Sequence, residues 1–571
     1  MEKNTLEREA EGPLGAISAA HARHPGKPYV AEAELVRLRD PAWFPAVFWL
    51  YLMLAAGYIG WRVLIVNWHT PLGPALFAVE LFSIAYASLH LWTIKEIWVP
   101  SHRPAPQWGV VDVLITTVNE PLEVIEPTVA AAMRVRGIRR VLVLDDGARP
   151  EVEQLAHRYG ARWIGRTSKQ HAKAGNLNNG LQYTDAEFIL EFDVDHIPRP
   201  EFLERTMGHF DDPLVAVVQT PQTYYNTDSF LFRRTHLGLW SDQGMFYDTI
   251  QPGKNRSNSA FFVGTSAVLR RKALDSIGGY STSTATEDIH TALRLHAAGW
   301  KSVFVPEVLA EGLETASLLE FFRQRRRWAA GSFGLLLRSK DSPLVTPGLS
   351  LAQRLNYIAA TLGHVGGLQR LVFLLLPVLA IFTLQKPILV PGVMWLAPMM
   401  LFALTTTLAV SLYGRGSYHP IHTEAALLVS WMSSLAGLWG VIQVRRKFSP
   451  SRKLVDRKEG LRLKAGIWGL FALVGLALAR GAWLLYDGKL PSDLTASIIV
   501  PSVLCVYDLL LLGSFLIHLE RYERSVDQVS GIPERLLAAV HGRDEHAEVI
   551  SFAAFEAARR DRERKTGTRT H

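Results

Sequence analysis

Long apolar runs occur in two groups along the chain, separated by a middle region of mixed polarity. Six runs are long enough to cross a hydrocarbon core of ~30 Å as helices. They are residues 43–66, 72–94, 358–384, 389–412, 467–485 and 498–519. The pattern therefore predicts a helical membrane domain with about six transmembrane helices, two before the middle region and four after it.

In the middle region, short β-branched runs alternate with helix-like stretches. The predicted strands are residues 110–117, 140–144, 188–192 and 214–218, and the predicted helices are residues 122–134, 151–159 and 172–182. Such alternation predicts an α/β domain with a mostly parallel sheet covered on both faces. Parallel sheets bind ligands at the carboxyl ends of their strands. Polar clusters follow three of the predicted strands, namely Asn119-Glu120, Asp145-Asp146 and the pair Asp193 and Asp195, so we expect them to meet at one edge.

Three further stretches are amphipathic, at residues 318–337, 351–361 and 423–444. Stretches of this kind lie at a membrane surface, and here they would seat the α/β domain on the membrane helices. The predicted organisation is listed in chain order: an N-terminal segment 1–41, a transmembrane hairpin 42–95, the α/β domain 105–340, membrane and interface helices 341–519, and a C-terminal tail 520–571.

Basic residues predict the orientation in the membrane. The connectors 67–71, 385–387 and 487–497 carry almost none, whereas residues 445–464 hold nine Lys and Arg. Because basic residues are retained in the cytoplasm, we expect both termini and the α/β domain on the cytoplasmic side of a plasma (inner) membrane. The net charge of +8 then reflects this bias and attraction to anionic lipid, and no nucleic-acid partner is expected.

Several classes of site are excluded by composition. Cys505 is the single cysteine, so a disulfide, a zinc site or thiol catalysis within one chain is not expected. Residues 1–41 lack an apolar core, so no cleavable signal peptide is predicted. The sequence has neither GxxxxGK[ST] nor GxGxxG, which argues against an ATPase loop or a dinucleotide fold. A nucleotide site built from carboxylates, without a glycine-rich loop, implies that Mg²⁺ or Mn²⁺ lies between the acidic side chains and the diphosphate of the nucleotide.

Four short segments carry the candidate chemistry: Asp145-Asp146-Gly147, Asp193-Val194-Asp195, Thr286-Glu287-Asp288 and Gln324-Arg325-Arg326-Arg327-Trp328. Each alone is typical of a solvated loop or a helix cap. They occur together with further matches at residues 118–121, 171–178, 219–222, 262–266 and 278–280. Taken in this order, the segments make residues 110–335 resemble the catalytic domain of the processive family 2 glycosyltransferases, most closely the cellulose-synthase-like branch. The resemblance implies a GT-A-like domain that uses a UDP-sugar donor and elongates a polysaccharide by inverting transfer.

The resemblance also implies roles in binding the nucleotide. Asp146, with Asp145 beside it, would contact uracil and ribose, and Lys173 would lie near the diphosphate. The remaining nucleotide-binding candidates are Thr117, Glu120, Asp193, Gln324 and Arg327. The plain alternatives are a turn at the Asp-Gly pair, a solvated helix lysine and, for Gln324 to Trp328, a basic and aromatic helix at the membrane surface.

The metal and the reaction are assigned in the same way. Asp195 is the expected metal ligand, with His196 as a second candidate. Asp288 is the expected general base, with Glu287 and Thr286 beside it, because an inverting displacement needs one carboxylate to accept the proton of the acceptor hydroxyl. The alternative for Thr286 and Glu287 is a cap on the helix that follows.

Trp328 offers a flat face for an acceptor sugar at a channel mouth. Residues 445–460 resemble the family's gating loop at Phe448 and Lys453, with Ser451 in place of threonine. A basic linker beside the membrane explains the same residues.

Three charged residues, Glu80, Arg480 and Asp508, fall inside predicted spans, where a charge costs at least ~2.5 kcal/mol unless it is paired or hydrated. They predict either the lining of a hydrated channel or an Arg480–Asp508 pair between the last two spans. The C-terminal tail is too short for the β-barrel through which cyclic dinucleotides control bacterial cellulose synthases, so such regulation is not expected.

The expected function is polymerisation of a UDP-sugar, UDP-glucose first, into a β-glucan that crosses the bilayer; accessory secretion subunits are candidate partners. Likeness at residues 193–196 and 250–253 favours glucose, and the linkage stays open between β-1,4, β-1,3 and mixed. The alternatives are a hyaluronan- or chitin-type synthase using UDP-N-acetylglucosamine, a non-processive lipid glycosyltransferase, and a passive transporter or scaffold.

Overall fold

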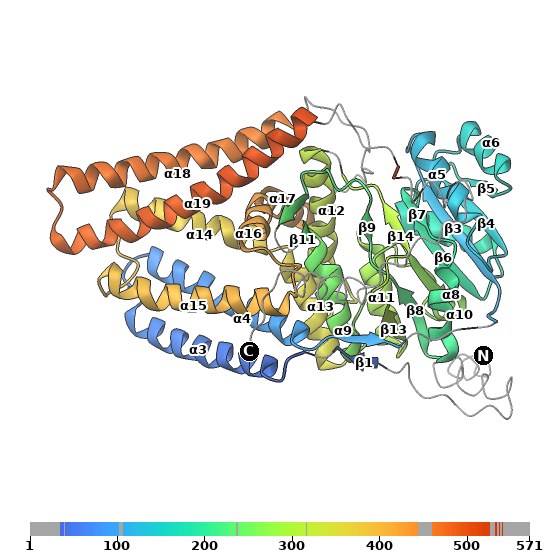
Figure 1. Cartoon of the computed structure of the whole chain (residues 1–571), viewed down its shortest axis with the longest axis horizontal. Helices are drawn as coiled ribbons and strands as arrows, with labels where there is room; N and C mark the ends of the chain where they lie inside the picture. The colour runs from blue at the N-terminus through green and yellow to red at the C-terminus, as the bar shows by residue number, and fades with distance from the viewer. Residues whose placement is uncertain are drawn as a thin grey trace, which may run out of the picture.

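The computed structural model describes residues 35–442, apart from residues 39, 102–104, 106, 236–237 and 316, together with residues 460–525, 532, 533, 536 and 540. Long helices form a bundle at one end of the molecule, and the α/β domain lies at the other (Figure 1). The candidate gating loop, with Phe448, Ser451 and Lys453, lies outside the described residues.

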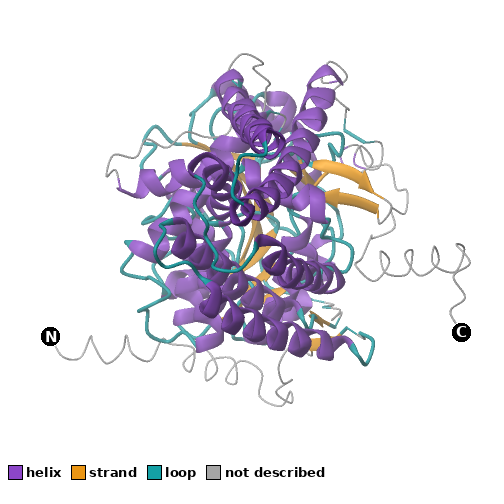
Figure 2. Ribbon diagram, turned by 90° about the vertical axis from the view of Figure 1, so that its left-hand side faces the viewer, coloured by secondary structure: helices purple, strands orange, loops and turns teal. Residues whose placement is uncertain are grey.

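Six helices in the described part of the chain are long and apolar enough to cross a membrane, as predicted. They are α3 (Phe44–Ile65), α4 (Leu72–Ile94), α14 (Gly366–Thr383), α15 (Gly392–Tyr413), α18 (Leu461–Asp487) and α19 (Ser492–Ser525). Figure 2 views the bundle from its free end, with the helices clustered in front of the strands. The connection between α18 and α19 turns at Gly488, whose φ of 64° is a left-handed conformation that glycine adopts without strain.

Helices α12 (Leu318–Leu337), α13 (Leu351–Gly363), α16 (Pro420–Val429) and α17 (Trp431–Ile442) lie between the bundle and the α/β domain (Figure 1). The prediction for residues 318–337 agrees with α12, which begins where the Ser317 side chain accepts a hydrogen bond from the Glu320 amide. The predicted stretch 423–444 is instead two helices, α16 and α17, with a bend of 40°. Taken as one broken span, this pair would be a seventh crossing.

The α/β domain is built on a seven-stranded sheet in the order β13-β8-β12-β6-β3-β4-β5. Its strands are β3 (Val111–Thr117), β4 (Arg140–Asp145), β5 (Arg162–Gly165), β6 (Phe188–Asp193), β8 (Val215–Gln219), β12 (Ala267–Arg270) and β13 (Lys301–Phe304). All neighbours run parallel except β12, which is antiparallel to both β6 and β8. The four predicted strands are confirmed, and β5, β12 and β13 were not predicted.

Both faces of the sheet are covered, as the near-continuous apolar runs of its strands require. Helices α7 (Ala172–Gly180), α10 (Arg271–Ser276) and α11 (Glu287–Ala297) contribute to one apolar core, and α5 (Leu122–Ala132) and α6 (Pro150–Arg158) contribute to the other. Along β3, Leu114 belongs to the first core and Val113 and Ile115 to the second. This alternation fixes which side chains of each strand can reach a ligand at the edge.

Two smaller features lie against this domain. A three-stranded sheet of β7 (His196–Pro198), β14 (Ala310–Gly312) and β9 (Thr223–Tyr224) follows directly from the Asp193–Asp195 segment. In the C-terminal tail, the buried Leu536 and Val540 pack with Ala130, Ala131 and Ile197, so the tail returns from the membrane helices to the α/β domain.

Among the charged residues inside the spans, Glu80 has partners in its own hairpin, whereas Arg480 and Asp508 do not form the predicted pair. Glu80 accepts hydrogen bonds from Arg62 Nε at 2.7 Å and from the Tyr58 hydroxyl at 2.9 Å. The predicted Arg480–Asp508 pair is wrong, because close packing of Gly481 against Ser502 places Asp508 about six residues, or ~9 Å, further along α19. Asp508 instead lines a cavity within the bundle.

Candidate active site

The carboxyl ends of three neighbouring parallel strands meet level with one another. Thr117 at the end of β3 pairs with Asp145 at the end of β4, and Thr116 pairs with Asp193 at the end of β6. The register therefore brings the polar clusters to one edge of the sheet, as predicted.

The two aspartates of the Asp-Asp-Gly segment have different surroundings. Asp145 accepts hydrogen bonds from the amides of Gly147 at 2.9 Å and Arg149 at 2.7 Å, so it stabilises the turn that follows β4. Asp146 accepts two hydrogen bonds from Arg166, at 2.6 and 2.9 Å. A bidentate arginine holds the Asp146 carboxylate in a fixed orientation at the mouth of the site. Nothing in the sequence pattern pointed to Arg166.

Two other nucleotide-binding candidates, Thr117 and Glu120, bond to each other. Glu120 accepts from the Thr117 hydroxyl at 2.7 Å and from the Val118 amide at 2.8 Å. Arg149 donates to the Thr117 hydroxyl at 2.8 Å. These contacts close the loop after β3 and fix its position beside Asp145.

Lys173 lies at the centre of the site. Its ammonium group donates to Asp193 Oδ1 at 2.6 Å and to the Gly264 carbonyl, and it lies 3.1 Å from Glu191 Oε1. Burial opposes the positive charge, but Asp193 and Glu191 together outweigh it and raise the pKa of Lys173 above its usual value. Burial also raises the pKa of Glu191 to about 7, with Lys173 acting against it. Glu191 was not among the predicted site residues, although its position two residues before Asp193 places it on the same face of β6.

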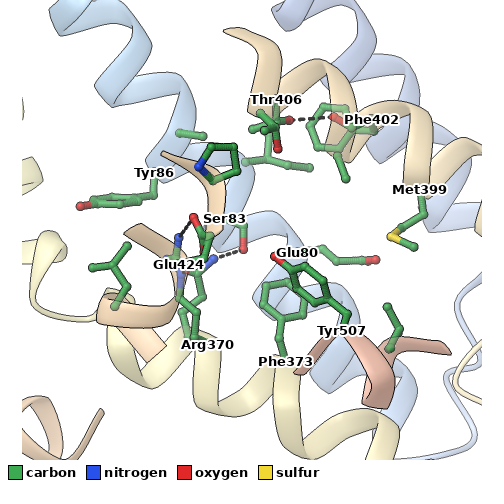
Figure 3. A pocket seen from close by; sticks show the side chains of 18 of the residues that line it. Glu80, Ser83, Tyr86, Arg370, Phe373, Met399, Phe402, Thr406, Glu424 and Tyr507 are labelled. Atoms are coloured by element: carbon green, nitrogen blue, oxygen red, sulfur yellow. Dashed lines mark hydrogen bonds and ion pairs between the residues drawn. The ribbon is translucent and has the colours of Figure 1, made fainter. Parts of the chain in front are cut away.

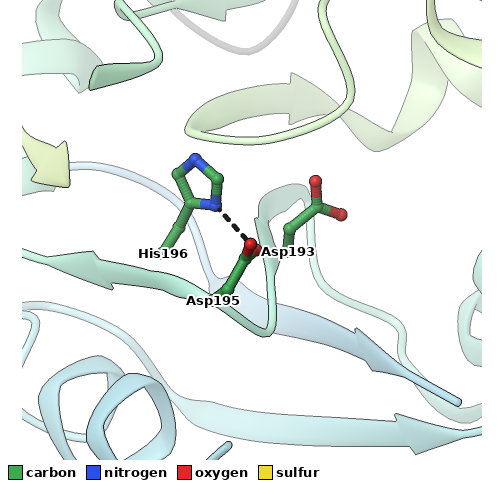
Figure 4. A group of neighbouring side chains, drawn as sticks. All are labelled: Asp193, Asp195 and His196. Carbon is green, nitrogen blue, oxygen red and sulfur yellow. Dashed lines mark hydrogen bonds and ion pairs between the residues drawn. The ribbon is translucent and has the colours of Figure 1, made fainter. Parts of the chain in front are cut away.

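Asp193, Asp195 and His196 form a compact acidic group after β6 (Figure 4). One potential ligand atom from each residue lies within 4.8 Å of the other two. His196 Nδ1 lies 3.0 Å from Asp195 Oδ1, and the buried Nε2, close to Gly312, has no hydrogen-bond partner among the described residues. Two carboxylates with an imidazole nearby fit the oxygen-rich coordination of Mg²⁺ or Mn²⁺.

Asp288 lies in the first turn of α11, and its carboxylate and the ammonium group of Lys173 both approach Gly264. Gly264 has φ of 87°, and a Cβ atom there would lie 3.3 Å from Asp288 Oδ2 and 3.4 Å from Lys173 Nζ. Burial, followed by the charge of Glu287, raises the pKa of Asp288 to about 7, while Lys173 and Arg327 oppose the shift. A carboxyl group that titrates near neutral pH is suited to accept a proton from a substrate hydroxyl.

Thr286 occupies the N-cap position of α11 but makes no capping hydrogen bond through its side chain. A Cβ atom on Gly331 of α12 would come within 2.5 Å of Thr286 Oγ1. The threonine is therefore a packing contact between α11 and α12, which aligns Asp288 with the Gln324–Trp328 segment.

The Gln324–Trp328 segment lies on α12. Arg325 pairs with Asp242 and places its guanidinium 4.5 Å from the centre of the Trp328 ring. The buried Gln324 Oε1 has no hydrogen-bond partner in the described part of the chain. Arg327 acts on Asp288 through its charge. Trp328 is half-buried, so part of its ring is accessible to solvent.

A cavity of about 610 Å³ lies between the membrane helices. Asp242, the partner of Arg325, is part of its lining, and at the far end the lining includes Leu72 and Ile388, next to the connectors between spans. Figure 3 shows polar groups among the mostly apolar lining, including Arg370, which bonds Glu424 at 2.8 and 3.0 Å. The cavity is thus linked to the Gln324–Trp328 segment through the pair of Asp242 with Arg325.

Comparisons with known proteins agree with this architecture. Residues 188–438 match the family model described as glycosyl transferase family group 2. The chain is 34% identical over 445 residues to cellulose synthase 1 of Komagataeibacter xylinus, covering 73% of this chain and 28% of that protein. It is 39% identical over 291 residues to the UDP-forming cellulose synthase catalytic subunit of Pseudomonas fluorescens (strain SBW25), covering 50% of this chain and 39% of that one. The protein therefore carries a family 2 glycosyltransferase domain, and it spans less than half the length of these curated relatives.

Among solved structures, the chain is similar to a mannosyltransferase from Pyrobaculum calidifontis in complex with GDP-Man and Mn²⁺. The TM-score is 0.45 at 17% identity, covering 70% of this chain and 100% of that one.

Proposed function

We propose that the protein is an inverting glycosyltransferase that elongates a β-glucan from UDP-glucose and passes it through the membrane bundle. One observation carries this proposal. Lys173, Asp193 and Asp288 converge around Gly264 at the ligand-binding edge of the sheet, next to a helix whose Arg325 pairs with Asp242, a lining residue of the cavity between the membrane helices.

The donor would bind along the strand ends. Asp146, held by Arg166, suits the hydrogen-bond donors of a nucleoside, and Lys173 and Arg327 suit the diphosphate. Asp193 and Asp195 would hold Mg²⁺ or Mn²⁺, and His196 would orient Asp195 through their hydrogen bond. Such an ion neutralises charge on the leaving diphosphate.

Asp288 is proposed as the general base. Its carboxylate accepts the proton of an acceptor hydroxyl while that oxygen forms a bond to the anomeric carbon of the donor. The bond from that carbon to the diphosphate breaks on the opposite side, and UDP leaves with the bonding electrons. The substitution occurs once, so the configuration inverts, and one carboxylate is enough.

The acceptor chain would lie against Trp328, whose ring offers apolar contact area without a directional bond. The cavity between the membrane helices would then offer the chain a route across the membrane. We assign residues 105–340 to a glycosyltransferase domain on the cytoplasmic side, because the basic residues concentrate in segments next to it. Residues 445–460 remain our candidate for a gating loop.

A second candidate is transfer of one sugar to a lipid, favoured by the mostly apolar lining of the cavity. Products distinguish the two functions. The purified protein in lipid is incubated with radiolabelled UDP-glucose and, separately, UDP-N-acetylglucosamine, and the product is digested with linkage-specific glucanases. We expect a glucanase-sensitive polymer from UDP-glucose alone. A solvent-extractable glycolipid would contradict the proposal, and polymer made only from UDP-N-acetylglucosamine would correct the donor.

A further inference from the structure

Three acceptors surround the ammonium group of Lys173, and one of them, Glu191, has no role in the proposed function. Glu191 and Asp193 are two residues apart on β6, so both point to the face of the sheet that α7 covers. The Glu191 side chain is fully buried, whereas 35% of the Asp193 side chain is exposed. Glu191 is therefore the inner partner of Lys173, and Asp193 is the outer partner at the mouth of the site.

Lys173 donates hydrogen bonds to Asp193 and to the Gly264 carbonyl, and its contact with Glu191 is an ion pair. Lys173 Nζ lies 2.6 Å from Asp193 Oδ1 and 3.1 Å from Glu191 Oε1. In this arrangement Asp193 is committed to Lys173 although it also belongs to the acidic group with Asp195. A cation that binds Asp193 therefore competes with that ammonium group for the carboxylate.

The stability of the Lys173 charge depends on which partners it keeps when Asp193 moves to bind a cation. If Asp193 turns outward, Lys173 still has a buried carboxylate and a carbonyl as partners, so its charge stays compensated. Without Glu191, the same movement would leave the buried ammonium group in contact with one neutral partner, the Gly264 carbonyl, and with the charge of Glu287 acting without direct contact, which is unfavourable. Lys173 would then hold Asp193 more tightly.

From this geometry, and resting on the metal-dependent transfer proposed above, we infer that Glu191 is a positioning residue. It holds Lys173 in place and thereby frees Asp193 to bind a divalent cation. Partners behind a metal ligand typically change metal affinity 10–100-fold when they are replaced, and the lower end is expected here because Asp195 is left untouched.

The test measures Mn²⁺ binding to the full-length protein in detergent, without a sugar donor, from the electron paramagnetic resonance signal of free Mn²⁺. Glu191→Gln removes the charge and keeps the shape, and it is expected to weaken Mn²⁺ binding about tenfold. Glu187→Gln is the matched control, because it makes the same change at an exposed residue just before β6. It should bind as the wild type does.

Two further variants test whether Glu191 acts by holding Lys173 in place or only through its negative charge. Glu191→Asp keeps the charge but shortens the side chain, so it should also weaken binding. In a Lys173→Met background, Glu191→Gln should have little further effect, because the residue through which Glu191 acts is gone. Thermal melting identifies which of the Glu191 variants are folded, and either one is sufficient for the comparison.

The inference is overturned if folded Glu191 variants bind Mn²⁺ as the wild type does. It is also overturned if Glu191→Gln weakens binding equally with Lys173 and with methionine at position 173, since that result would mean a direct effect of charge. Wild-type protein that binds no Mn²⁺ would contradict the proposed metal dependence itself, which is a different failure.

Discussion

Replacing Asp288 by asparagine removes a carboxylate that the fold disfavours. Burial and Glu287 raise its pKa from 3.8 to about 7. One pKa unit corresponds to about 1.4 kcal/mol, so ionised Asp288 destabilises the folded state by about 4 kcal/mol at most. Because the side chain is partly exposed to solvent, screening reduces the value to about 2 kcal/mol.

The sign of the effect follows from which form the folded state prefers. The folded protein favours protonated Asp288. Below about pH 4 the residue is protonated in both the folded and the unfolded state and has no effect. The destabilisation grows as the pH rises and is complete above about pH 7. Asp288→Asn should therefore melt a few degrees higher than the wild type at about pH 8, and the difference should fade as the pH falls toward 4.

The same variant should lose activity, because a positioned general base contributes about 10²- to 10⁴-fold to the rate. UDP binding should persist, since the contacts of Asp193 and Lys173 are unchanged. Asp275→Asn is the matched control at a largely exposed aspartate. Thermal melts across pH, UDP affinity and sugar transfer are measured on the same preparations. Polymer synthesis at the wild-type rate, or a melting temperature that is lower at every pH, would refute this account of Asp288.

Four further outcomes are expected. Wild-type kcat/KM should rise through about pH 7 and then level, because Asp288 must be ionised to accept a proton; a flat profile in stopped assays from pH 5 to about 9 would argue against it. Asp195→Ala should weaken Mn²⁺-dependent UDP binding in calorimetry, and turnover undiminished in excess EDTA would contradict a metal role. Trp328→Ala should shorten product chains more than it weakens donor binding, and the reverse pattern would place this ring at the donor site. Glu80→Ala leaves the buried Arg62 without its carboxylate and should destabilise the protein by about 3–5 kcal/mol, whereas an unchanged melting temperature would mean that water compensates the charge.

The fold was predictable where local pattern and final packing agree. The strands at β3, β4, β6 and β8 are buried on both faces, so they read as apolar runs. The strands β5, β12 and β13 have four residues each, which is too short for a periodic pattern to be distinguished. The insertion of β12 between β6 and β8 depends on pairing over long sequence separations, which the local sequence does not encode.

In the candidate site, too, residues in short sequence motifs were predictable, and residues that act through long-range contacts were not. Asp193, Asp195 and Asp288 stand in short motifs, so the sequence alone pointed to them. Glu191 and Arg166 act through contacts that only the folded chain creates, between a strand and a helix or between two loops.

The Arg480–Asp508 prediction failed for a related reason. Composition placed both charges in neighbouring spans, but side-chain packing at Gly481 sets the register between the two helices.

We propose that one chain both forms a glucan and moves it through its own membrane helices. The most direct test reconstitutes the purified protein in lipid vesicles, with Mg²⁺ and radiolabelled UDP-glucose added outside. Molecules with the catalytic domain facing outward should then build radiolabelled polymer that external β-glucanase cannot digest until detergent opens the vesicles. Polymer that the external enzyme digests at once, or label found only in extractable lipid, would contradict the account.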